Sequence, residues 1–84
     1  MAKGTIRYWA AAKEAAGVGE EPYDARTLAD ALAAAAARRD PEFARVVRRS
    51  SFLLDGQPVG TREHADIPLP DGGTIEVLPP FAGG

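Results

Sequence analysis

The sequence contains no cysteine and only one histidine, and these absences exclude several kinds of site. Without thiols the fold cannot depend on disulfide bonds, and the chain has no thiol nucleophile and no thiolate metal ligand of its own. The single His64 lies in a segment that we expect to be an exposed loop, where its side chain would be solvated rather than act as a base or a ligand. No metal site and no nucleophile–base constellation are therefore predicted.

Strong charge of one sign and long apolar runs are absent as well. The net charge of -2 gives no electrostatic argument for binding nucleic acid or an anionic membrane. The alanine-rich run that ends at Ala37 is far too short to span a bilayer, and the N-terminal stretch MAKGTIRYW lacks the apolar segment of a signal peptide. We therefore expect a cytoplasmic protein with no membrane and no nucleic-acid partner.

What the chain does contain is enough apolar material for one small domain. Hydrophobic residues make up 45% of its 84 residues, an ordinary fraction for a globular protein. β-Branched and aromatic residues with alternating polarity predict strands at 5–9, at an edge in 20–25 where Pro22 is tolerated, and at 74–78. Within 51–60 an Asp-Gly turn predicts a strand followed by a short returning segment.

Three helices are predicted between these strands. The first, residues 10–17, is rich in alanine, and Gly17 is a natural stop. Thr27 and Asp40 are the predicted N-caps of the second and third helices. Strands at both ends with helices between them predict an α+β fold, with a sheet covered by helices on one face and the first and last strands paired at its centre.

Periodicity also predicts which residues meet in the core. Apolar positions recur every second residue in the strands and every three to four residues in the helices. The residues predicted for the core on this basis are Ile6, Tyr8, Leu28, Leu32, Val47, Leu53, Ile75 and Val77.

An arginine cluster lies between residues 38 and 49. Arg38 and Arg39 are expected in the last turn of the second helix, where cations interact favourably with the helix dipole. For the whole cluster two interpretations stay open, a solvated face of two helices or a docking patch for an acidic partner. Its members are Arg38, Arg39, Arg45, Arg48 and Arg49.

The last strand is followed by PPFAGG, which we interpret as a functional tail, residues 79–84, on a domain formed by residues 1–78. Pro79 and Pro80 keep the backbone extended and end the sheet ladder, because neither can donate a hydrogen bond. At roughly 3.1 Å per residue, the tail would reach about 18 Å beyond the strand. Gly83 and Gly84 have no side chains, so they could enter a narrow channel and present the terminal carboxylate of Gly84 there. The alternative of a disordered end fits the Pro-Pro-Phe composition poorly.

These residues resemble the MoaD/ThiS family of sulfur-carrier proteins. The resemblance rests on VLPPFAGG (77–84), on IRYWAAAKEAAG (6–17) and on SFLLDGQPV (51–59), so it covers nearly the whole chain. A short helix after the first strand favours the branch of the small subunit of molybdopterin synthase over the thiazole-forming branch. One departure is Gly72-Gly73, where the family often has Gly-Asp before the last strand.

The resemblance implies a ubiquitin-like β-grasp fold and a non-catalytic carrier subunit, monomeric when free, that binds no permanent cofactor. An adenylating enzyme related to ubiquitin activators would use ATP to couple Gly84 to AMP, and a sulfurtransferase would convert the adenylate into a thiocarboxylate. The large subunit of molybdopterin synthase would then accept the tail, and the sulfur would pass to the pterin precursor of the molybdenum cofactor. Gly84 would carry the chemistry, and the residues in contact with the partner would be Pro79, Pro80, Phe81, Ala82 and Gly83.

We expect the partner to bind on the sheet face beside the tail, with Phe81 as an apolar anchor. Several alternatives stay open. The sulfur could instead serve thiamine, cysteine or tRNA thiolation. The chain could be a ubiquitin-like modifier whose Gly84 forms an isopeptide bond with a lysine, or an interaction module with an inert tail.

Overall fold

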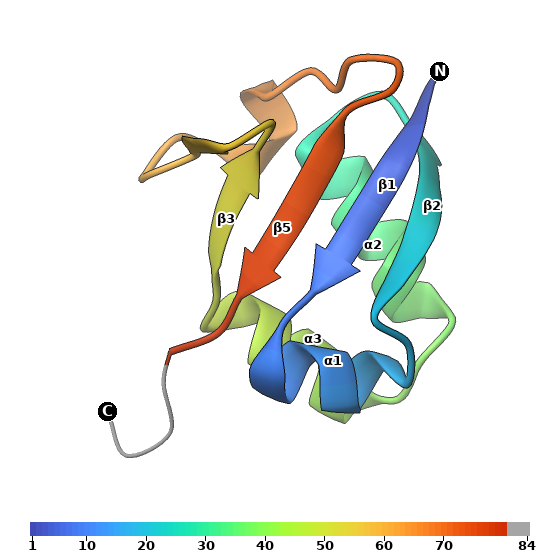
Figure 1. The fold of residues 1–84 in the computed structure, drawn as a ribbon, viewed down its shortest axis with the longest axis vertical. Coiled ribbons are helices and arrows are strands. Elements are labelled where there is room, and N and C mark those ends of the chain that lie inside the picture. The colour runs from blue at the N-terminus through green and yellow to red at the C-terminus, as the bar shows by residue number, and fades with distance from the viewer. Residues whose placement is uncertain (81–84) are drawn as a thin grey trace.

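The computed structural model describes residues 1–80, and residues 81–84 lie outside the described part. The chain begins and ends with a strand, and its main helices lie between β1 and β3 (Figure 1). The elements are β1 (Ala2–Tyr8), α1 (Ala10–Ala16), β2 (Glu20–Ala25), α2 (Leu28–Ala37), α3 (Pro41–Arg48), β3 (Ser51–Leu54), β4 (Gln57–Pro58), the 3-10 helix η1 (His64–Asp66) and β5 (Thr74–Leu78). The strands and helices predicted from the sequence are all present.

The strands form one mixed sheet in the order β2-β1-β5-β3-β4. At its centre β1 runs parallel to β5, with Ile6 opposite Ile75, and the other neighbouring strands are antiparallel. The predicted central pairing is confirmed, and so is the edge position of β2, which contains Pro22. Figure 1 shows α2 and α3 behind the sheet and α1 beneath its lower end, so the face toward the viewer stays open, as predicted.

Local capping signals set the boundaries of the helices. The Thr27 hydroxyl accepts a hydrogen bond from the backbone N–H of Asp30 at 3.2 Å, and the Asp40 carboxylate accepts one from the N–H of Glu42 at 3.2 Å. Gly17 follows α1 in the left-handed region with φ of 80°, a conformation that costs glycine little. The predicted ends of α1, α2 and α3 at these residues are therefore confirmed.

The core lies between the inner face of the sheet and the helices. Val47 is half-buried against it, and the core also takes in Tyr23 and Phe43, which were not among the residues predicted for the core. The other predicted core residues that are confirmed as buried are Ile6, Tyr8, Leu28, Leu32, Ile75 and Val77.

The prediction that Leu53 contributes to this core is wrong. In the register between β3 and β5, Phe52 lies opposite Val77 and Leu53 lies opposite Glu76. Side chains alternate between the two faces of a strand, so Phe52 is buried while Leu53 lies half-exposed on the open face.

Two further predictions are wrong. Arg38 and Arg39 do not lie in the last turn of α2, because that helix ends at Ala37 and Arg38 is its C-cap. His64 is not a solvated loop residue, since it belongs to η1, is half-buried, and packs edge-on against Phe52 with ring centroids 4.9 Å apart. Arg38 and Arg39 are positioned by Glu21, and His64 is positioned by Phe52. The periodicity of the sequence does not reveal such contacts between distant residues.

Close packing requires glycine at the end of the sheet where β1 begins. A Cβ atom on Gly73 would lie 2.7 Å from the Tyr23 hydroxyl, and one on Gly4 would overlap the Tyr23 ring. That hydroxyl donates a hydrogen bond to the carbonyl of Pro70 at 2.6 Å, which holds the turn before β5 in place. Gly72 in the same turn has φ of 76°. Both glycines of the unusual Gly72-Gly73 pair therefore have a structural reason.

Candidate functional site

The predicted tail begins where the central strand β5 ends, at Leu78, directly before the two prolines. This end of the sheet is also the one where α1 and the end of α3 lie (Figure 1). Pro79 is half-buried and Pro80 is exposed. They line a cleft of about 110 Å³ together with Ala11, Val46 and Arg49. The chain therefore leaves the domain between α1 and α3.

Only part of the predicted site lies within the described residues. The structure places Pro79 and Pro80 at the base of the tail. Their predicted contact with a partner, and the division into a domain of residues 1–78 and a tail, stay predictions. The other site residues lie outside the described part of the chain, and their roles also stay predictions: Phe81, Ala82, Gly83 and Gly84.

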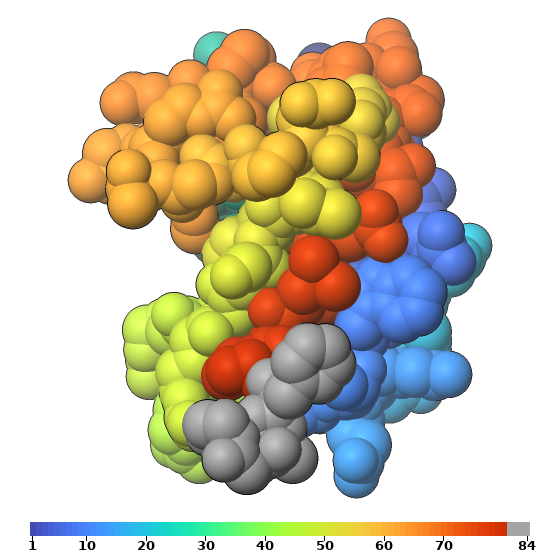
Figure 2. Space-filling view, turned by 60° about the vertical axis from the view of Figure 1, so that its left-hand side comes forward, coloured from blue at the N-terminus to red at the C-terminus, as the bar shows by residue number. Residues whose placement is uncertain are grey.

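The open face of the sheet adjoins the base of the tail. In Figure 2 the red atoms of β5 lie on this face between those of β3 and the blue atoms of β1. No helix of the described chain covers it, so it is available to a partner. Its side chains alternate with the buried ones along the strands and include Thr5, Arg7, Glu20, Leu53, Thr74, Glu76 and Leu78.

Trp9 is the largest apolar side chain at this face, and it is 42% exposed. Its indole Nε1 donates a hydrogen bond to Glu76 Oε1 at 3.1 Å, and the guanidinium carbon of Arg7 lies 5.2 Å from the centroid of its ring. An exposed aromatic ring held in a fixed orientation is typical of an interface hot spot. Trp9 is not among the site residues predicted from the sequence, although alternation from the apolar Tyr8 would have placed it on the open face.

A strained residue follows Trp9. Ala10 has φ of 48°, and this left-handed conformation costs a residue with a Cβ atom roughly 1–2 kcal/mol. The Trp9 N–H still donates to the carbonyl of Val77 at 3.2 Å, while the Trp9 carbonyl already accepts the first hydrogen bonds of α1. The left-handed conformation of Ala10 thus allows Trp9 to follow the end of β1, to cap the start of α1 and still to lie on the open face.

A charged network around Glu21 lies on the inner side of the sheet, because Glu21 lies opposite the buried Ile6 in the register of β1 and β2. The Glu21 carboxylate contacts the guanidinium group of Arg39 at 2.8 Å and that of Arg38 at 3.0 Å, and it accepts a hydrogen bond from the Tyr8 hydroxyl. Burial disfavours the charged carboxylate, but the hydrogen bonds from these three side chains outweigh it and lower the pKa of Glu21 to about 2. Burial and the adjacent carboxylate raise the pKa of Tyr8.

Arg39 connects this network to the helices. Its side chain is only 13% exposed. It donates hydrogen bonds to the carbonyls of Ala16 at 3.0 Å and Ala35 at 2.9 Å, near the ends of α1 and α2. Its guanidinium carbon also lies 4.8 Å from the centroid of the Phe43 ring in α3. Arg39 is therefore a structural residue and belongs neither to a solvated helix face nor to a docking patch.

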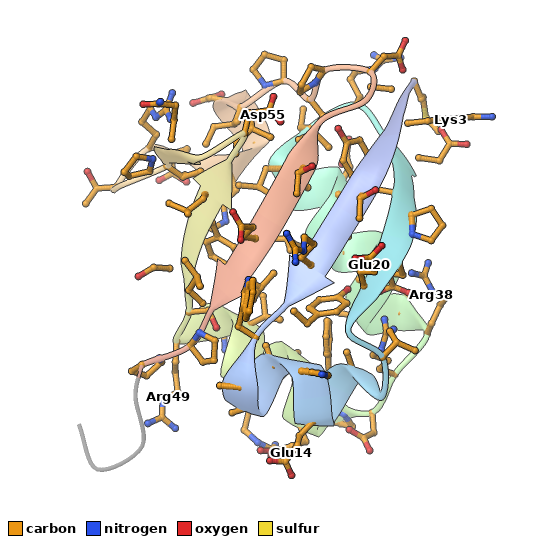
Figure 3. All side chains as sticks on the ribbon, viewed as in Figure 1. Lys3, Glu14, Glu20, Arg38, Arg49 and Asp55 are labelled. Carbon is orange, nitrogen blue, oxygen red and sulfur yellow. The ribbon has the colours of Figure 1, made fainter. Side chains whose placement is uncertain are left out.

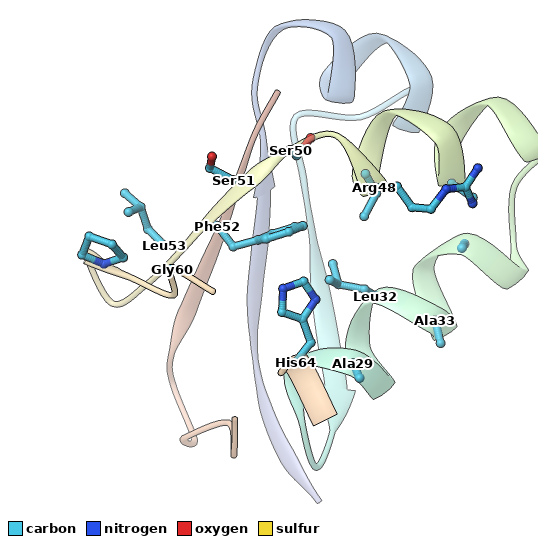
Figure 4. A pocket seen from close by; sticks show the side chains of 14 residues that line it. Ala29, Leu32, Ala33, Arg48, Ser50, Ser51, Phe52, Leu53, Gly60 and His64 are labelled. Atoms are coloured by element: carbon cyan, nitrogen blue, oxygen red, sulfur yellow. The ribbon is translucent and has the colours of Figure 1, made fainter. Parts of the chain in front are cut away.

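A larger hollow lies between α2, α3, β3 and η1 (Figure 4). Its volume is about 680 Å³, and most of its lining is apolar, with Leu32 and Phe52 on its walls and His64 packed beside them. Pro79 and Pro80 do not line it. The hollow is therefore not part of the candidate site at the base of the tail.

Residues 1–80 hold no candidate metal centre and no helix that could span a membrane. Among them, no three His, Cys, Asp or Glu side chains gather in a way that could hold a metal ion. In the same part of the chain, no helix has the length and apolar character needed to cross a bilayer.

Solved structures of other proteins share this architecture. The chain is similar to the small archaeal modifier protein 1 from Methanosarcina acetivorans, with a TM-score of 0.85 and 24% identity over 100% of this chain and 98% of that one. It is also similar to a putative molybdopterin converting factor, subunit 1, from Pyrococcus furiosus, with a TM-score of 0.76 and 25% identity over 96% and 100% of the two chains.

A third likeness is to a chain from the complex of subunits 1 and 2 of the molybdopterin-converting factor from Helicobacter pylori. Here the TM-score is 0.70 and the identity 22%, over 98% of this chain and 99% of that one. These likenesses confirm the predicted ubiquitin-like β-grasp fold. Among curated proteins no significant sequence match is found.

The sequence also matches the ThiS family over residues 6–84. This range covers nearly the whole chain and includes the PPFAGG segment on which the resemblance was first based. The chain therefore belongs to the ThiS family, within the MoaD/ThiS group of sulfur-carrier and ubiquitin-like proteins.

Proposed function

We propose that this protein is a sulfur carrier whose Gly84 is adenylated, converted to a thiocarboxylate, and used to donate sulfur in molybdopterin synthesis. One observation carries the proposal: the family match runs through the PPFAGG segment, and this segment follows directly from the central strand β5 beside an open sheet face. Such a position lets a rigid domain present a narrow tail to another protein.

The proposed chemistry follows from what a carboxylate can do. A carboxylate oxygen of Gly84 attacks the α-phosphate of ATP and releases pyrophosphate, which leaves an acyl adenylate. A sulfur nucleophile supplied by a sulfurtransferase then displaces AMP. Gly83 and Gly84 provide access to the narrow sites where these steps occur, because they carry no side chains.

Two likenesses support the molybdopterin branch. The Pyrococcus furiosus protein is named a putative molybdopterin converting factor, subunit 1, and the Helicobacter pylori structure is a complex of subunits 1 and 2 of that factor. By analogy, we propose that the large subunit of molybdopterin synthase receives the tail of this chain. The short helix α1 directly after β1 also agrees with this branch.

We further propose that the open sheet face binds that partner, with Trp9 and Phe81 as aromatic anchors. Trp9 supports this assignment because it is exposed, held by Glu76 and Arg7, and close to the base of the tail in the sheet. Aromatic side chains in such positions often contribute most of the binding energy of an interface.

The test is ATP-dependent sulfur loading with the adenylating enzyme and sulfurtransferase of the same organism, read by intact mass. The parent protein should gain the mass of sulfur replacing oxygen. A variant with one residue added after Gly84 should gain none, because its Gly84 carbonyl is an amide that cannot be adenylated.

A variant that lacks Gly84 is the matched control for tail length. Its carboxylate on Gly83 would sit about 3 Å short of the reacting phosphate, and an error of about 1 Å can already lower a rate roughly 100-fold. Both variants should melt at the parental temperature. If either acquired sulfur at the parental rate, the carrier proposal would have to be abandoned.

A ubiquitin-like modifier is the second candidate. It is favoured by the fold shared with small archaeal modifier protein 1, at a TM-score of 0.85. In the source cells, a ladder of conjugates of higher mass that depends on Gly84 would support this role, whereas unconjugated protein carrying sulfur would support the carrier. Among carriers, the acceptor that receives sulfur in a reconstituted reaction distinguishes molybdopterin synthesis from thiamine, cysteine or tRNA thiolation.

A further inference from the structure

The structure divides the arginine cluster into two groups. Arg38 and Arg39 both contact Glu21, and Arg45 contacts Glu42 at 2.8 Å. Within residues 1–80, neither Arg48 nor Arg49 has a carboxylate oxygen within 4.0 Å. These two side chains, which we call the α3 arginine pair, are exposed at the end of α3.

Arg49 lies where the tail leaves the domain, and Arg48 is its neighbour on the side of α3 that faces the hollow. Arg49 lines the small cleft that Pro79 and Pro80 also line. Figure 3 shows Arg49 beside the base of the tail, at the opposite end of the molecule from Lys3. Arg48 precedes it on α3 and lies at the rim of the hollow in Figure 4. A partner that receives the tail would therefore find Arg49 at the base of the tail and Arg48 next to it at the end of α3.

Stability of the fold does not account for the pair. Both side chains are exposed, and no side-chain hydrogen bond ties either of them to the described residues. They follow Arg45 by three and four positions, a spacing at which like charges on a helix repel each other. One cation near the end of α3 is enough for a favourable interaction with the helix dipole. The presence of several arginines there therefore needs another explanation.

The distribution of charge along the sheet points the same way. Residues 38–49 hold five arginines and two carboxylates, although the whole chain has a net charge of -2. At the other end, the connection from β4 to β5 holds one arginine and three carboxylates, Glu63, Asp66 and Asp71. Residues 38–49 therefore carry an excess of cations, and the connection from β4 to β5 carries an excess of carboxylates.

We propose that the α3 arginine pair is a docking patch for an acidic protein surface around the channel that receives the tail in the adenylating enzyme. This inference rests on the proposed function and adds the charge of the partner. Opposite charges accelerate encounter over distances of several ångströms, and salt weakens the effect. The pair would therefore guide the tail toward its channel before any close contact forms.

The test compares two double charge reversals that change the net charge equally. One variant is Arg48→Glu with Arg49→Glu, and its control is Lys3→Glu with Arg26→Glu at the far end of the sheet. Lys3 and Arg26 are exposed, and Ala2 and Ala25 beside them form the pair of β1 and β2 furthest from the tail. The readout is kcat/KM for pyrophosphate release by the adenylating enzyme, at low and at high salt.

Reversal of the α3 arginine pair should lower kcat/KM about 10-fold or more at low salt, and the loss should shrink to about twofold at high salt. The far-end control should stay within about twofold of the parent at low salt. Replacing both arginines by lysine should preserve most of the parental rate, since charge and not the guanidinium shape is required. A thermal melt of each variant confirms that the domain is folded.

Several results would overturn the inference. One is parental kcat/KM for the reversed pair at low salt, another is a loss that does not depend on salt, and a third is an equal loss in the far-end control. Each of these would leave the carrier function intact, because the parent protein would still be adenylated. Failure of the parent to be adenylated at all would instead contradict the proposed function.

Discussion

The two faces of the sheet are made by the same strands, yet they carry different kinds of residues. Ile6, Ile75 and Val77 on the inner face are fully buried, whereas Thr5, Arg7 and Glu76 beside them point to the open face. The inner face therefore holds the fold together, and the open face is free to bind. Substitutions on the two faces should accordingly separate stability from partner binding.

The largest expected effect tests the inner face. Leu28→Ala should lower the free energy of unfolding by about 2–5 kcal/mol, because it removes a fully buried side chain and leaves a cavity. Leu53→Ala is the matched control, since Leu53 lies half-exposed on the open face, and its effect should stay near about 0.5 kcal/mol. Urea unfolding measures both, and similar losses for the two leucines would show that the faces are not distinct.

The charged network is the next test, because it lies at the rim of the inner face. Glu21→Gln should cost about 3 kcal/mol, since it leaves the largely buried guanidinium group of Arg39 without its carboxylate. Glu42→Gln removes the carboxylate of the exposed pair with Arg45, and it should cost no more than about 1 kcal/mol. Equal losses in the two variants would contradict the structural role of the network.

The same network predicts how stability depends on pH. The pKa of Glu21 falls from an ordinary 4.5 to about 2 on folding, so its contribution is fully present above pH 4.5 and is lost as the pH falls toward 2. The shift corresponds to roughly 3 kcal/mol. Urea unfolding across this range should show a steeper loss for the parent than for Glu21→Gln. Parallel curves would mean that Glu21 is not the group responsible.

A smaller effect on stability is expected from the close packing around Gly73, at the end of the sheet furthest from the tail. Gly73→Ala places a Cβ atom 2.7 Å from both the Tyr23 hydroxyl and a ring carbon of Pro70, and overpacking of this kind costs about 1–3 kcal/mol. Gly19→Ala meets nothing closer than 3.5 Å and should change stability by less than about 0.5 kcal/mol. Thermal melts compare the two variants directly.

The smallest effect on stability should come from the open face. Trp9→Ala should change the free energy of unfolding by less than about 1 kcal/mol, because the side chain is partly exposed. If Trp9 is an anchor, the same variant should weaken binding to the large synthase subunit by about 30-fold or more, the loss expected for a hot spot. Calorimetric titration measures the affinity, and the control is Val18→Ala, which removes a similarly exposed apolar side chain from the connection between α1 and β2. Unchanged affinity would remove Trp9 from the proposed interface.

Much of the fold could be predicted because its signals are local. Gly17, Thr27 and Asp40 end or begin helices through their own backbone and side-chain chemistry, and the alternation in 74–78 identifies β5 without any partner. The central pairing of β1 with β5 was predicted, but other features decided by distant contacts were not. In SFLL three apolar residues follow one another, so only the pairing with β5 shows that Phe52 and not Leu53 faces the core.

The candidate site shows the same division. The tail motif is readable in the sequence, because its prolines and glycines act through their own backbone properties. The sequence did not reveal the roles of the arginines, because Arg39 binds Glu21 from another element and is only partly exposed, whereas Arg49 lies beside Pro79 after the chain has folded. The position of Trp9 on the open face could have been predicted by alternation from Tyr8. Trp9 becomes a candidate for binding only when its hydrogen bond to Glu76 is known.

The proline in the edge strand β2 has a consequence for how the protein behaves at high concentration. The Tyr8 N–H donates a hydrogen bond to the Gly19 carbonyl, between β1 and β2. Along β2 the backbone groups point alternately toward β1 and away from it, so those of Pro22, three residues further on, point away from the sheet. A strand from another molecule that tried to pair with this edge would find no N–H at its middle position, and it would meet the charges of Glu20 and Asp24 on either side. The edge therefore resists the strand-by-strand growth that leads to aggregates.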